Sequence, residues 1–370
     1  MKKLLSEVCT IQYGFPFDSA KFSDSNGMPL IRIRDVVRGY SETYTTEEYK
    51  SEYIVHENDL LIGMDGEFNI AKWGKTPALL NQRVCRLAPK DSIDKDYLFY
   101  FMPVALKRIE EKTPFVTVKH LSAKELNKIE IPVLSLEEQR KIAETLSKVD
   151  ELIAFREQQI AKLDELVKAR FVEMFGDINV SNKKWMTYPL GELCTIVRGG
   201  SPRPIERYLG GTIPWIKIGD ATTGENIYLN STKEHIIQEG VKKSRMIKAG
   251  SLIFANCGVS LGFARIITFD GCIHDGWLAM EDIDEKLDKI FLLYSLNQMT
   301  EYFRKTAPAG TQPNLNTNIM KMHRQIVPPM EMQKAFISFV KCADRQKQTV
   351  QQSLEKLELM KKALMQEYFG

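Results

Sequence analysis

The most constraining feature of this 370-residue chain is that it repeats itself once. Residues 5–11 recur at 190–196, and the residues between 139 and 176 recur between 333 and 370. The spacing between matching residues grows slightly along the chain, as loop insertions would produce. Chance similarity does not give nearly constant spacing across separate segments, so we interpret the chain as two copies of one unit.

Each copy begins with a mixed segment, 1–135 in the first copy and 185–330 in the second. Short runs rich in β-branched residues, bounded by Gly, Pro and Asn, predict strands. Longer periodic stretches predict helices between them. The predicted strands are 30–34, 59–63, 213–218, 250–256 and 264–269, and the predicted helices are 96–111 and 286–306. We therefore expect an α+β fold for each segment, and we call the two segments the first head and the second head.

Each copy ends in one long predicted helix, 136–178 in the first and 331–370 in the second. Prolines that precede both helices fix where the helices can begin, since an internal proline would break them. Ser135 and Glu138 have the spacing of a capping box at the start of the first helix. Beyond them, apolar residues recur at alternating steps of three and four, which is the pattern of a coiled-coil seam.

The expected seam is apolar except at a few charged positions. Its apolar members are Ile142, Leu146, Val149, Ile153, Ile160, Leu163, Val167, Phe336, Val340, Val350, Leu354, Leu357 and Leu364. The charged residues in it are Arg156, Arg170, Lys347 and Lys361. We predict that the two helices pair antiparallel in one intramolecular coiled coil, with the copies related by a pseudo-two-fold axis. The alternative is that each helix packs only on its own head.

A rod of two such helices would separate the heads by a distance that suits DNA. A helix of about 38 residues is about 57 Å long. Paired DNA readers sit one or more helical turns apart, and one turn is about 34 Å. Heads with a shared framework and different loops would read two different half-sites, so the expected site on double-stranded DNA is asymmetric and interrupted. The same geometry also fits other elongated ligands.

The candidate DNA contacts lie in loops and on one predicted strand. Arginine suits phosphate or guanine, and the amides of Asn and Gln can pair with adenine. The candidates are Tyr13, Arg32, Arg34, Lys119 and His120 in the first head, and Arg198, Ser201, Arg203, Lys217, Asn256, Gln312 and Asn314 in the second. We expect Arg32 and Arg34 on one face of a strand, with Lys217 in the place of Arg32. Each of these residues also has a plainer reading, as a turn former or a solvent-facing charge.

The sequence contains no recognisable catalytic constellation. Residues 327–330 read Val-Pro-Pro-Met, which lacks the polar and aromatic residues with which an adenine methyltransferase holds a flipped base. Residues 69–76 contain Gly-Lys-Thr but not the first glycine of a Walker motif. The six cysteines form no Cys-x-x-Cys pair, and no cluster of metal ligands stands out. We therefore expect a non-catalytic chain that binds no metal.

Composition and charge indicate the compartment and the need for partners. Neither a run of about 18 apolar residues nor a signal peptide is found, which predicts a cytoplasmic protein that does not enter a membrane. The net charge is +3, with the excess of basic residues in the second half. A protein that held DNA alone would usually be more basic, so we expect partner subunits to supply part of the grip on the phosphates.

Two segments that lead into the long helices resemble a known family. They read IEIPVLSLEEQRKIA at 129–143 and IVPPMEMQK at 326–334. Both are similar to the I-P-L-P-P-L-x-E-Q entry into the helices of the specificity subunits of Type I restriction-modification systems. The first segment has Val133 and Leu134 where the family has the second proline, and the second has Met332 before Gln333. The segment 310–315 is also similar, and the resemblance covers nearly the whole chain.

The resemblance implies a division of labour. The heads would be target recognition domains, each reading one half of a bipartite site. The helices would be the spacer and the docking surface for two methyltransferase subunits, which use S-adenosylmethionine to methylate adenine at N6. Restriction subunits that use ATP and Mg can join such an assembly. This chain would bind none of these cofactors, and we expect its two repeats to be complete.

Two other functions remain open at this stage. A helical scaffold or adaptor could use the same helices without reading DNA, with the charged seam residues selecting its partners. A nuclease with an unrecognised active site is the other alternative, and turnover of DNA by the pure chain would be its signature.

Overall fold

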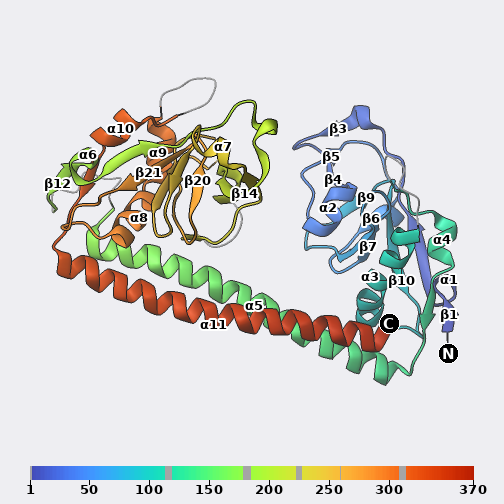
Figure 1. Ribbon diagram of the computed structural model, residues 1–370. Helices are drawn as coiled ribbons and strands as arrows, with labels where there is room; N and C mark the ends of the chain where they lie inside the picture. The colour runs from blue at the N-terminus through green and yellow to red at the C-terminus, as the bar shows by residue number, and fades with distance from the viewer. Residues whose placement is uncertain (1, 113–118, 178–184, 222–226, 259, 308–313) are drawn as a thin grey trace. The chain divides into compact units, whose positions relative to one another are not determined.

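The computed structural model describes residues 2–112, 119–177, 185–221, 227–258, 260–307 and 314–370 (Figure 1). The chain divides into two compact units, Met1–Glu157 with Gln351–Gly370, and Gln158–Val350. Both divisions fall inside long helices, so each unit holds one head together with parts of both helices. This agrees with the α+β fold class predicted for the heads.

The first head contains three sheets and several short helices. A four-stranded sheet has the order β2-β10-β7-β8, a five-stranded sheet has the order β3-β5-β4-β9-β6, and β1 pairs with β11. Its elements are β1 (Lys2–Leu4), α1 (Leu5–Val8), β2 (Cys9–Tyr13), η1 (Ser19–Lys21), β3 (Phe22–Ser23), β4 (Met28–Ile31), α2 (Ile33–Arg38), β5 (Tyr44–Thr45), η2 (Ser51–Tyr53), β6 (Ile54–Val55), β7 (Leu60–Gly63), β8 (Asn69–Lys72), β9 (Ala78–Leu80), β10 (Val84–Pro89), α3 (Lys95–Lys112), α4 (Ala123–Asn127) and β11 (Glu130–Pro132).

The second head repeats this plan. Its sheets have the orders β13-β21-β18-β19-β15 and β16-β14-β20-β17, and β12 pairs with β22. Its elements are β12 (Thr187–Pro189), α6 (Leu190–Leu193), β13 (Thr195–Arg198), η3 (Ile205–Arg207), β14 (Leu209–Ile216), η4 (Ile218–Ala221), β15 (Tyr228–Leu229), β16 (Glu234–Ile236), α7 (Gln238–Val241), β17 (Arg245–Ile247), β18 (Leu252–Ala255), β19 (Ala264–Ile267), β20 (Gly271–Ile273), β21 (Trp277–Glu281), α8 (Lys289–Gln298), α9 (Thr300–Thr306), α10 (Thr317–Met322) and β22 (Arg324–Ile326).

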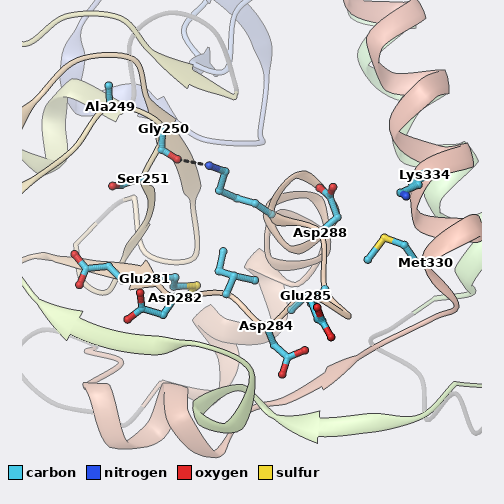
Figure 2. Close-up of a pocket in the computed structure, with 14 residues that line it drawn as sticks. Ala249, Gly250, Ser251, Glu281, Asp282, Asp284, Glu285, Asp288, Met330 and Lys334 are labelled. Atoms are coloured by element: carbon cyan, nitrogen blue, oxygen red, sulfur yellow. Dashed lines mark hydrogen bonds between the residues drawn. The ribbon is translucent and has the colours of Figure 1, made fainter.

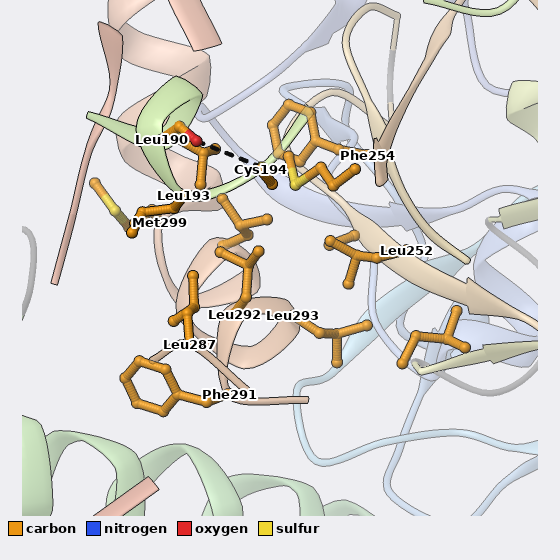
Figure 3. Close-up of a cluster of buried hydrophobic side chains, with 14 of the residues drawn as sticks. Leu190, Leu193, Cys194, Leu252, Phe254, Leu287, Phe291, Leu292, Leu293 and Met299 are labelled. Atoms are coloured by element: carbon orange, nitrogen blue, oxygen red, sulfur yellow. Dashed lines mark hydrogen bonds between the residues drawn. The ribbon is translucent and has the colours of Figure 1, made fainter. Parts of the chain in front are cut away.

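Strand β18 shows why each head needs two apolar layers. All four of its residues are buried, so it reads as a continuous apolar run rather than an alternating one. Because successive side chains point to opposite faces, Leu252 and Phe254 enter the core formed with α6 and α8 (Figure 3). Ile253 and Ala255 enter a separate core on the other face.

Three expectations for the elements are wrong in detail. The strand expected at 213–218 ends at Ile216, because Asp220 accepts from the Lys217 N–H at 2.7 Å and a short helix follows. The predicted strand 30–34 ends at Ile31, because Asp35 accepts a hydrogen bond from the Arg32 backbone N–H at 2.9 Å and starts helix α2. The predicted helix 286–306 is two helices, α8 and α9, which meet at Met299. Among the helices of the described residues, none is long and apolar enough to cross a membrane.

The long helices are α5 (Leu136–Phe175) and α11 (Met330–Phe369). The capping box at the start of α5 is present, with the Glu138 N–H 3.3 Å from Ser135 Oγ and the Ser135 N–H 3.0 Å from Glu138 Oε2. The first turns of both helices are tied to their heads by a buried glutamine. Gln139 accepts from the Asp94 N–H at 2.8 Å, and Gln333 accepts from the Asp288 N–H at 2.8 Å.

Each head also receives the far end of the other long helix. In the first unit, Phe369 of α11 packs edge-on against Tyr97, with ring centroids 5.4 Å apart. In the second unit, Phe175 of α5 packs edge-on against Phe291 at 4.9 Å. Each head therefore rests on the start of one long helix and the end of the other, and the packing repeats between the two units.

Contacts between α5 and α11 show that the helices pair antiparallel in both units. In the first unit Asp150 lies 2.6 Å from Lys361, and Arg156 Nε donates to Ser353 Oγ at 3.2 Å. In the second unit Asp164 lies 2.9 Å from Lys347, and Phe171 contacts Phe336 with centroids 5.4 Å apart. The partner's number in α11 falls as the number in α5 rises. Every apolar residue of the expected seam is buried or half-buried.

Candidate nucleic-acid interface

In each head, three loops and the segment before the last short helix are joined by backbone hydrogen bonds. In the first head, the Gly14 N–H donates to the Val84 carbonyl at 3.0 Å, the Met64 N–H to Arg83 at 2.9 Å and the Leu121 N–H to Met64 at 2.7 Å. We call the residues 13–15, 64–66, 81–83 and 119–121 the first junction. It gathers residues that are far apart in the sequence, including Tyr13, Lys119 and His120 from the predicted candidates.

The second head builds the same frame from equivalent residues. The Gly199 N–H donates to Trp277 at 2.9 Å, the Asn256 N–H to Gly276 at 2.9 Å and the Leu315 N–H to Asn256 at 2.8 Å. We call the residues 198–201, 256–258, 274–276 and 314–315 the second junction. The predicted candidates Arg198, Ser201, Asn256 and Asn314 belong to it.

A glycine at the same place in each junction lets the loop approach the chain itself. A Cβ on Gly14 would lie 2.0 Å from the Asn81 carbonyl oxygen, and one on Gly199 would lie 2.2 Å from the His274 carbonyl oxygen. No side chain fits at such distances, so these glycines fix the loop after β2 or β13 against the turn after β9 or β20. Their role is therefore to build the frame of the junction.

The first junction carries one carboxylate, one guanidinium and one imidazole. Asp65 Oδ1 lies 2.5 Å from Nδ1 of His120, and its Oδ2 lies 3.7 Å from Nε of Arg83. The side chains of Arg83 and His120 are each about half exposed, at 52% and 47%. Lys119 is turned toward α3, where its Nζ donates to the Glu110 carbonyl at 2.9 Å. Tyr13 lies half-buried against the core of this head.

The second junction is built around Asp275. Ser201 Oγ donates to Asp275 Oδ1 at 2.7 Å, and the Asp275 N–H lies 3.4 Å from that hydroxyl. Arg198 donates from Nε to the Asp275 carbonyl oxygen at 2.8 Å, and its guanidinium lies 4.0 Å from the carboxylate. One residue therefore contacts two of the predicted candidates.

The electrostatics of Asp275 show how many positive groups surround it. Burial is the largest single effect and acts to raise the pKa of the carboxyl, but the Ser201 hydrogen bond and the nearby positive charges together outweigh it, so the pKa is lowered. Those charges belong to Arg198, Arg203 and the protonated form of His274. Arg203 is exposed, so it adds a cation at the rim of the junction.

His274 is neutral in this setting. Burial lowers its pKa, and the cations Lys217, Arg203 and Arg198 lower it further against the opposing effect of Asp275. His274 Nδ1 lies 2.9 Å from the Gly276 backbone nitrogen and 2.9 Å from Asp275 Oδ1. Its ring lies 5.5 Å from the ring of Trp215.

Three amide atoms in the second junction have no hydrogen-bond partner among the described residues. Asn256 is fully buried, and neither its Nδ2 nor its Oδ1 is paired. Asn314 Oδ1 is also buried and unpaired. Buried polar groups are normally satisfied, so an unpaired amide is a candidate for contact with a ligand. In the first head the equivalent residues are Met64 and His120.

The remaining candidates lie outside the two junctions. Arg32 and Arg34 are both exposed at the start of helix α2 and do not share a strand face. Lys217 has the place expected from the repeat, since its N–H is capped by Asp220 at 2.7 Å as that of Arg32 is by Asp35. Its Nζ lies 2.5 Å from Glu234 Oε1. Gln312 lies outside the described residues.

Asp65, Arg83 and Asp275 were not predicted from the sequence. Each lies in a turn that has no motif, and only the pairing of strands brings it to a junction. Comparison of the two copies could have drawn attention to Asp65 and Arg83, because these charged residues align with the uncharged Cys257 and Gly276 of the second copy.

The second head also has an acidic hollow of about 650 Å³ away from the junction (Figure 2). Its carboxylates come from Glu281, Asp282, Asp284, Glu285 and Asp288. Lys289 donates to the Gly250 carbonyl at 2.5 Å across it, and Lys334 of α11 lies at its edge. Such a surface repels phosphates, so it distinguishes this side of the head from the cationic junction. In the described part of the chain, no three His, Cys, Asp or Glu residues are grouped to hold a metal ion.

Comparison with known proteins identifies the class. The family model described as the Type I restriction modification DNA specificity domain matches residues 1–165 and again 182–359. The chain therefore belongs to the family of Type I restriction-modification DNA specificity subunits. The double match agrees with the two copies found in the sequence and in the structure.

Individual relatives carry the same description. The Type I restriction enzyme EcoBI specificity subunit of Escherichia coli is 40% identical over 164 residues, which cover 44% of this chain and 34% of that relative. The MjaVIII specificity subunit of Methanocaldococcus jannaschii is 24% identical over 91% of this chain and 87% of its own length. The match to the first relative thus spans about a third of that protein.

Solved structures show that the fold is shared. The S subunit of a Type I restriction-modification system from M. genitalium aligns with a TM-score of 0.57 at 16% identity, over 100% of this chain and 96% of its own. A chain from a structure that addresses complex assembly and conformational transition of the type I R-M system aligns with a TM-score of 0.63 at 16% identity, over 100% and 97%.

Proposed function

We propose that the chain reads an asymmetric, bipartite site on double-stranded DNA, with one half-site read at each junction. The observation that carries this proposal is that the two heads repeat one backbone frame and display different chemistry on it. The first junction presents Arg83 and His120 next to Asp65. The second presents Arg198, Ser201 and unpaired amides next to Asp275. Different groups on one frame suit two different base sequences.

The charges at the second junction support contact with DNA. Arg198, Arg203 and Lys217 all lie close enough to influence the ionisation of His274. Arginine side chains can bind phosphate, and they can also form two hydrogen bonds with guanine. The amide of asparagine can form two hydrogen bonds with adenine. Asn314 lies across an isolated β-bridge from Cys257, and burial and Asp275 raise the pKa of that cysteine. The charge of Arg198 also acts on the pKa of Cys257 and lowers it. The Asn314 amide and the Arg198 cation therefore lie around the same cysteine.

The proposal includes the partners and their cofactors. Two methyltransferase subunits that bind S-adenosylmethionine would dock on α5 and α11 and methylate adenine at N6 within the site. Restriction subunits that use ATP and Mg would join the same assembly. This chain would supply sequence recognition and no catalytic group, and the partners would supply much of the phosphate contact that a net charge of +3 does not provide.

The proposal is tested by selecting DNA with the assembled complex. The chain and its methyltransferase subunits are purified together and used to recover bound duplexes from a random pool. We expect the enriched sequences to share two short defined blocks separated by a gap of fixed length. Enrichment of a single block, or of no sequence at all by a stable complex, would contradict the proposal.

A pair of variants in the first head makes the test specific. Arg83→Ala removes the exposed guanidinium of the first junction, and we expect it to alter one block and leave the other unchanged. Arg38→Ala is the matched control. Arg38 is the last residue of α2, is similarly exposed at 48%, and lies 3.9 Å from the Glu42 carboxylate. The control should select the same two blocks as the unmodified chain.

A further inference from the structure

Backbone contacts fix the course of the loop after β13, and separate contacts hold its side chains. Gly199 is held against the His274 carbonyl, and the Gly200 N–H donates to Ile273 at 3.0 Å. Arg245 donates from Nε to the Arg198 carbonyl at 2.9 Å. These contacts settle where the loop runs. They do not settle where the guanidinium of Arg198 and the hydroxyl of Ser201 point.

Asp275 contacts both of these groups. Its carboxylate accepts from Ser201 Oγ at 2.7 Å and lies 4.0 Å from the Arg198 guanidinium, while its carbonyl accepts from Arg198 Nε at 2.8 Å. The Asp275 side chain is only partly exposed, at 36%. A group with this geometry restricts the rotamers of its neighbours before any ligand arrives.

The first head uses another residue at this place. The backbone frame aligns Gly14 with Gly199 and Val84 with Trp277, so Gln82 stands where the second head has Asp275. The carboxylate of the first junction is Asp65, which lies in the loop after β7 and contacts Arg83 and His120. The orienting carboxylate is therefore a separate feature of each head and is not imposed by the shared frame.

We propose that Asp275 is the positioning residue of the second head, which holds Arg198 and Ser201 in the orientation in which they meet DNA. The inference rests on the proposed function and deepens it, because it names the group that sets specificity at one half-site. Asp275 itself is an anion and repels phosphate, so its presence beside a DNA site needs a reason other than direct binding. Preorganisation of two reading groups supplies that reason.

The two opposing effects of Asp275 make the proposal testable by sign. If the carboxylate only adds negative charge, its removal strengthens binding to every duplex. If it positions Arg198 and Ser201, its removal weakens binding to the selected site while binding to other DNA is unchanged or stronger. We expect Asp275→Asn to weaken binding to the selected duplex by about tenfold, because the Arg198 guanidinium loses the charge beside it and Ser201 loses a charged acceptor, although the backbone carbonyl still accepts from Arg198 Nε.

The experiment compares the selected bipartite duplex with a duplex of scrambled sequence, using the complex of the chain with its methyltransferase subunits. Asp270→Asn is the matched control, because Asp270 accepts from Lys248 Nζ at 2.7 Å and from the Ala249 N–H at 2.9 Å at a turn outside the junction. The control should keep the affinity for both duplexes. Asp275→Glu, which keeps the charge, should recover part of the lost discrimination.

The melting temperature of Asp275→Asn would reveal a folding defect, and a second variant tests the proposal if such a defect occurs. Ser201→Ala removes one partner of the carboxylate, and we expect a loss of about threefold for the selected duplex only. An unchanged ratio of the two affinities in these variants would overturn the role of Asp275. If the unmodified complex fails to distinguish the two duplexes, the proposed function itself is wrong, so the two failures are separate.

Discussion

The two heads share one backbone frame and differ in the side chains that this frame carries. Backbone hydrogen bonds at the junctions match pair by pair, and so do the two glycines that allow close approach. The side chains do not match. Met64, Gln82 and Ile129 of the first head stand where the second has Asn256, Asp275 and His323. The comparison teaches that backbone contacts can fix where a group is placed while its chemistry is free to change.

The largest expected effect tests the shared part of this comparison. Gln139 and Gln333 are fully buried, and each amide holds three backbone groups of its head and helix start. Replacing either by Leu leaves these groups unpaired, and each costs about 1–3 kcal/mol. We expect Gln139→Leu and Gln333→Leu to lower the free energy of unfolding of their own unit by a similar amount, about 4 kcal/mol, in urea titrations.

The exposed Gln351 of α11 provides the control for this prediction. Gln351→Leu should change the free energy of unfolding by less than about 0.5 kcal/mol. A large loss from Gln139→Leu with almost none from Gln333→Leu would break the claim that the two units are anchored alike.

The next effect sharpens the difference between the heads through pH. His323 is buried without a partner for Nε2 among the described residues, and burial lowers its pKa to about 4. The unfolded chain binds this proton near pH 6.5, so stability is full above that value and is lost as the pH falls toward 4. The loss amounts to about 3 kcal/mol in the second unit.

Ile129 occupies this place in the first unit, so the same titration is absent there. We expect His323→Leu to remove most of the difference in melting temperature of the second unit between pH 7 and pH 5. The measurement is thermal unfolding followed at both pH values. An equal acid sensitivity in the variant and the unmodified chain would exclude His323 as its source.

The smallest expected effect concerns the two ion pairs between the long helices. Lys361 with Asp150 and Lys347 with Asp164 are half-exposed, so each pair is worth about 0.5–1 kcal/mol. A double-mutant cycle with Lys→Met and Asp→Asn at each pair should give this coupling energy in both units. Salt should reduce it. A coupling of zero at one pair would show that only the other helps to set the register of the helices.

The same lysines address self-association. In the antiparallel pairing each lysine meets an aspartate of the other helix, which favours pairing of α5 with α11. We expect the double variant Lys347→Leu and Lys361→Leu to form oligomers in sedimentation analysis. A strictly monomeric variant would show that these charges do not select the pairing.

The repeat and the long helices could be predicted because both leave periodic signals in the sequence. The capping box at Ser135 and the seam from Ile142 onward depend on local spacing, which a single helix preserves. The strand expected at 30–34 was wrong because Asp35 caps a helix at Arg32, and this local contact competes with the β-branched run that suggested a strand. For the heads, the α+β fold class could be predicted, but the order in which the strands pair could not.

The candidate site could be predicted only in part. Arg198, Ser201, Asn256 and Asn314 are brought together at the second junction, because strands β13, β18 and β21 pair side by side. Asp275 and Arg83 were missed because nothing in their local sequence marks them. They acquire their place from pairing between segments up to about 80 residues apart, and no local pattern records such pairing.

The most direct test of two heads with separate half-sites is methylome sequencing of cells that express the chain with the methyltransferase of its system. The unmodified chain should produce a new interrupted motif that carries N6-methyladenine. Arg83→Ala should alter one part of that motif, and Asp275→Asn should alter the other. Absence of a new motif, or loss of both parts with either variant, would contradict the account.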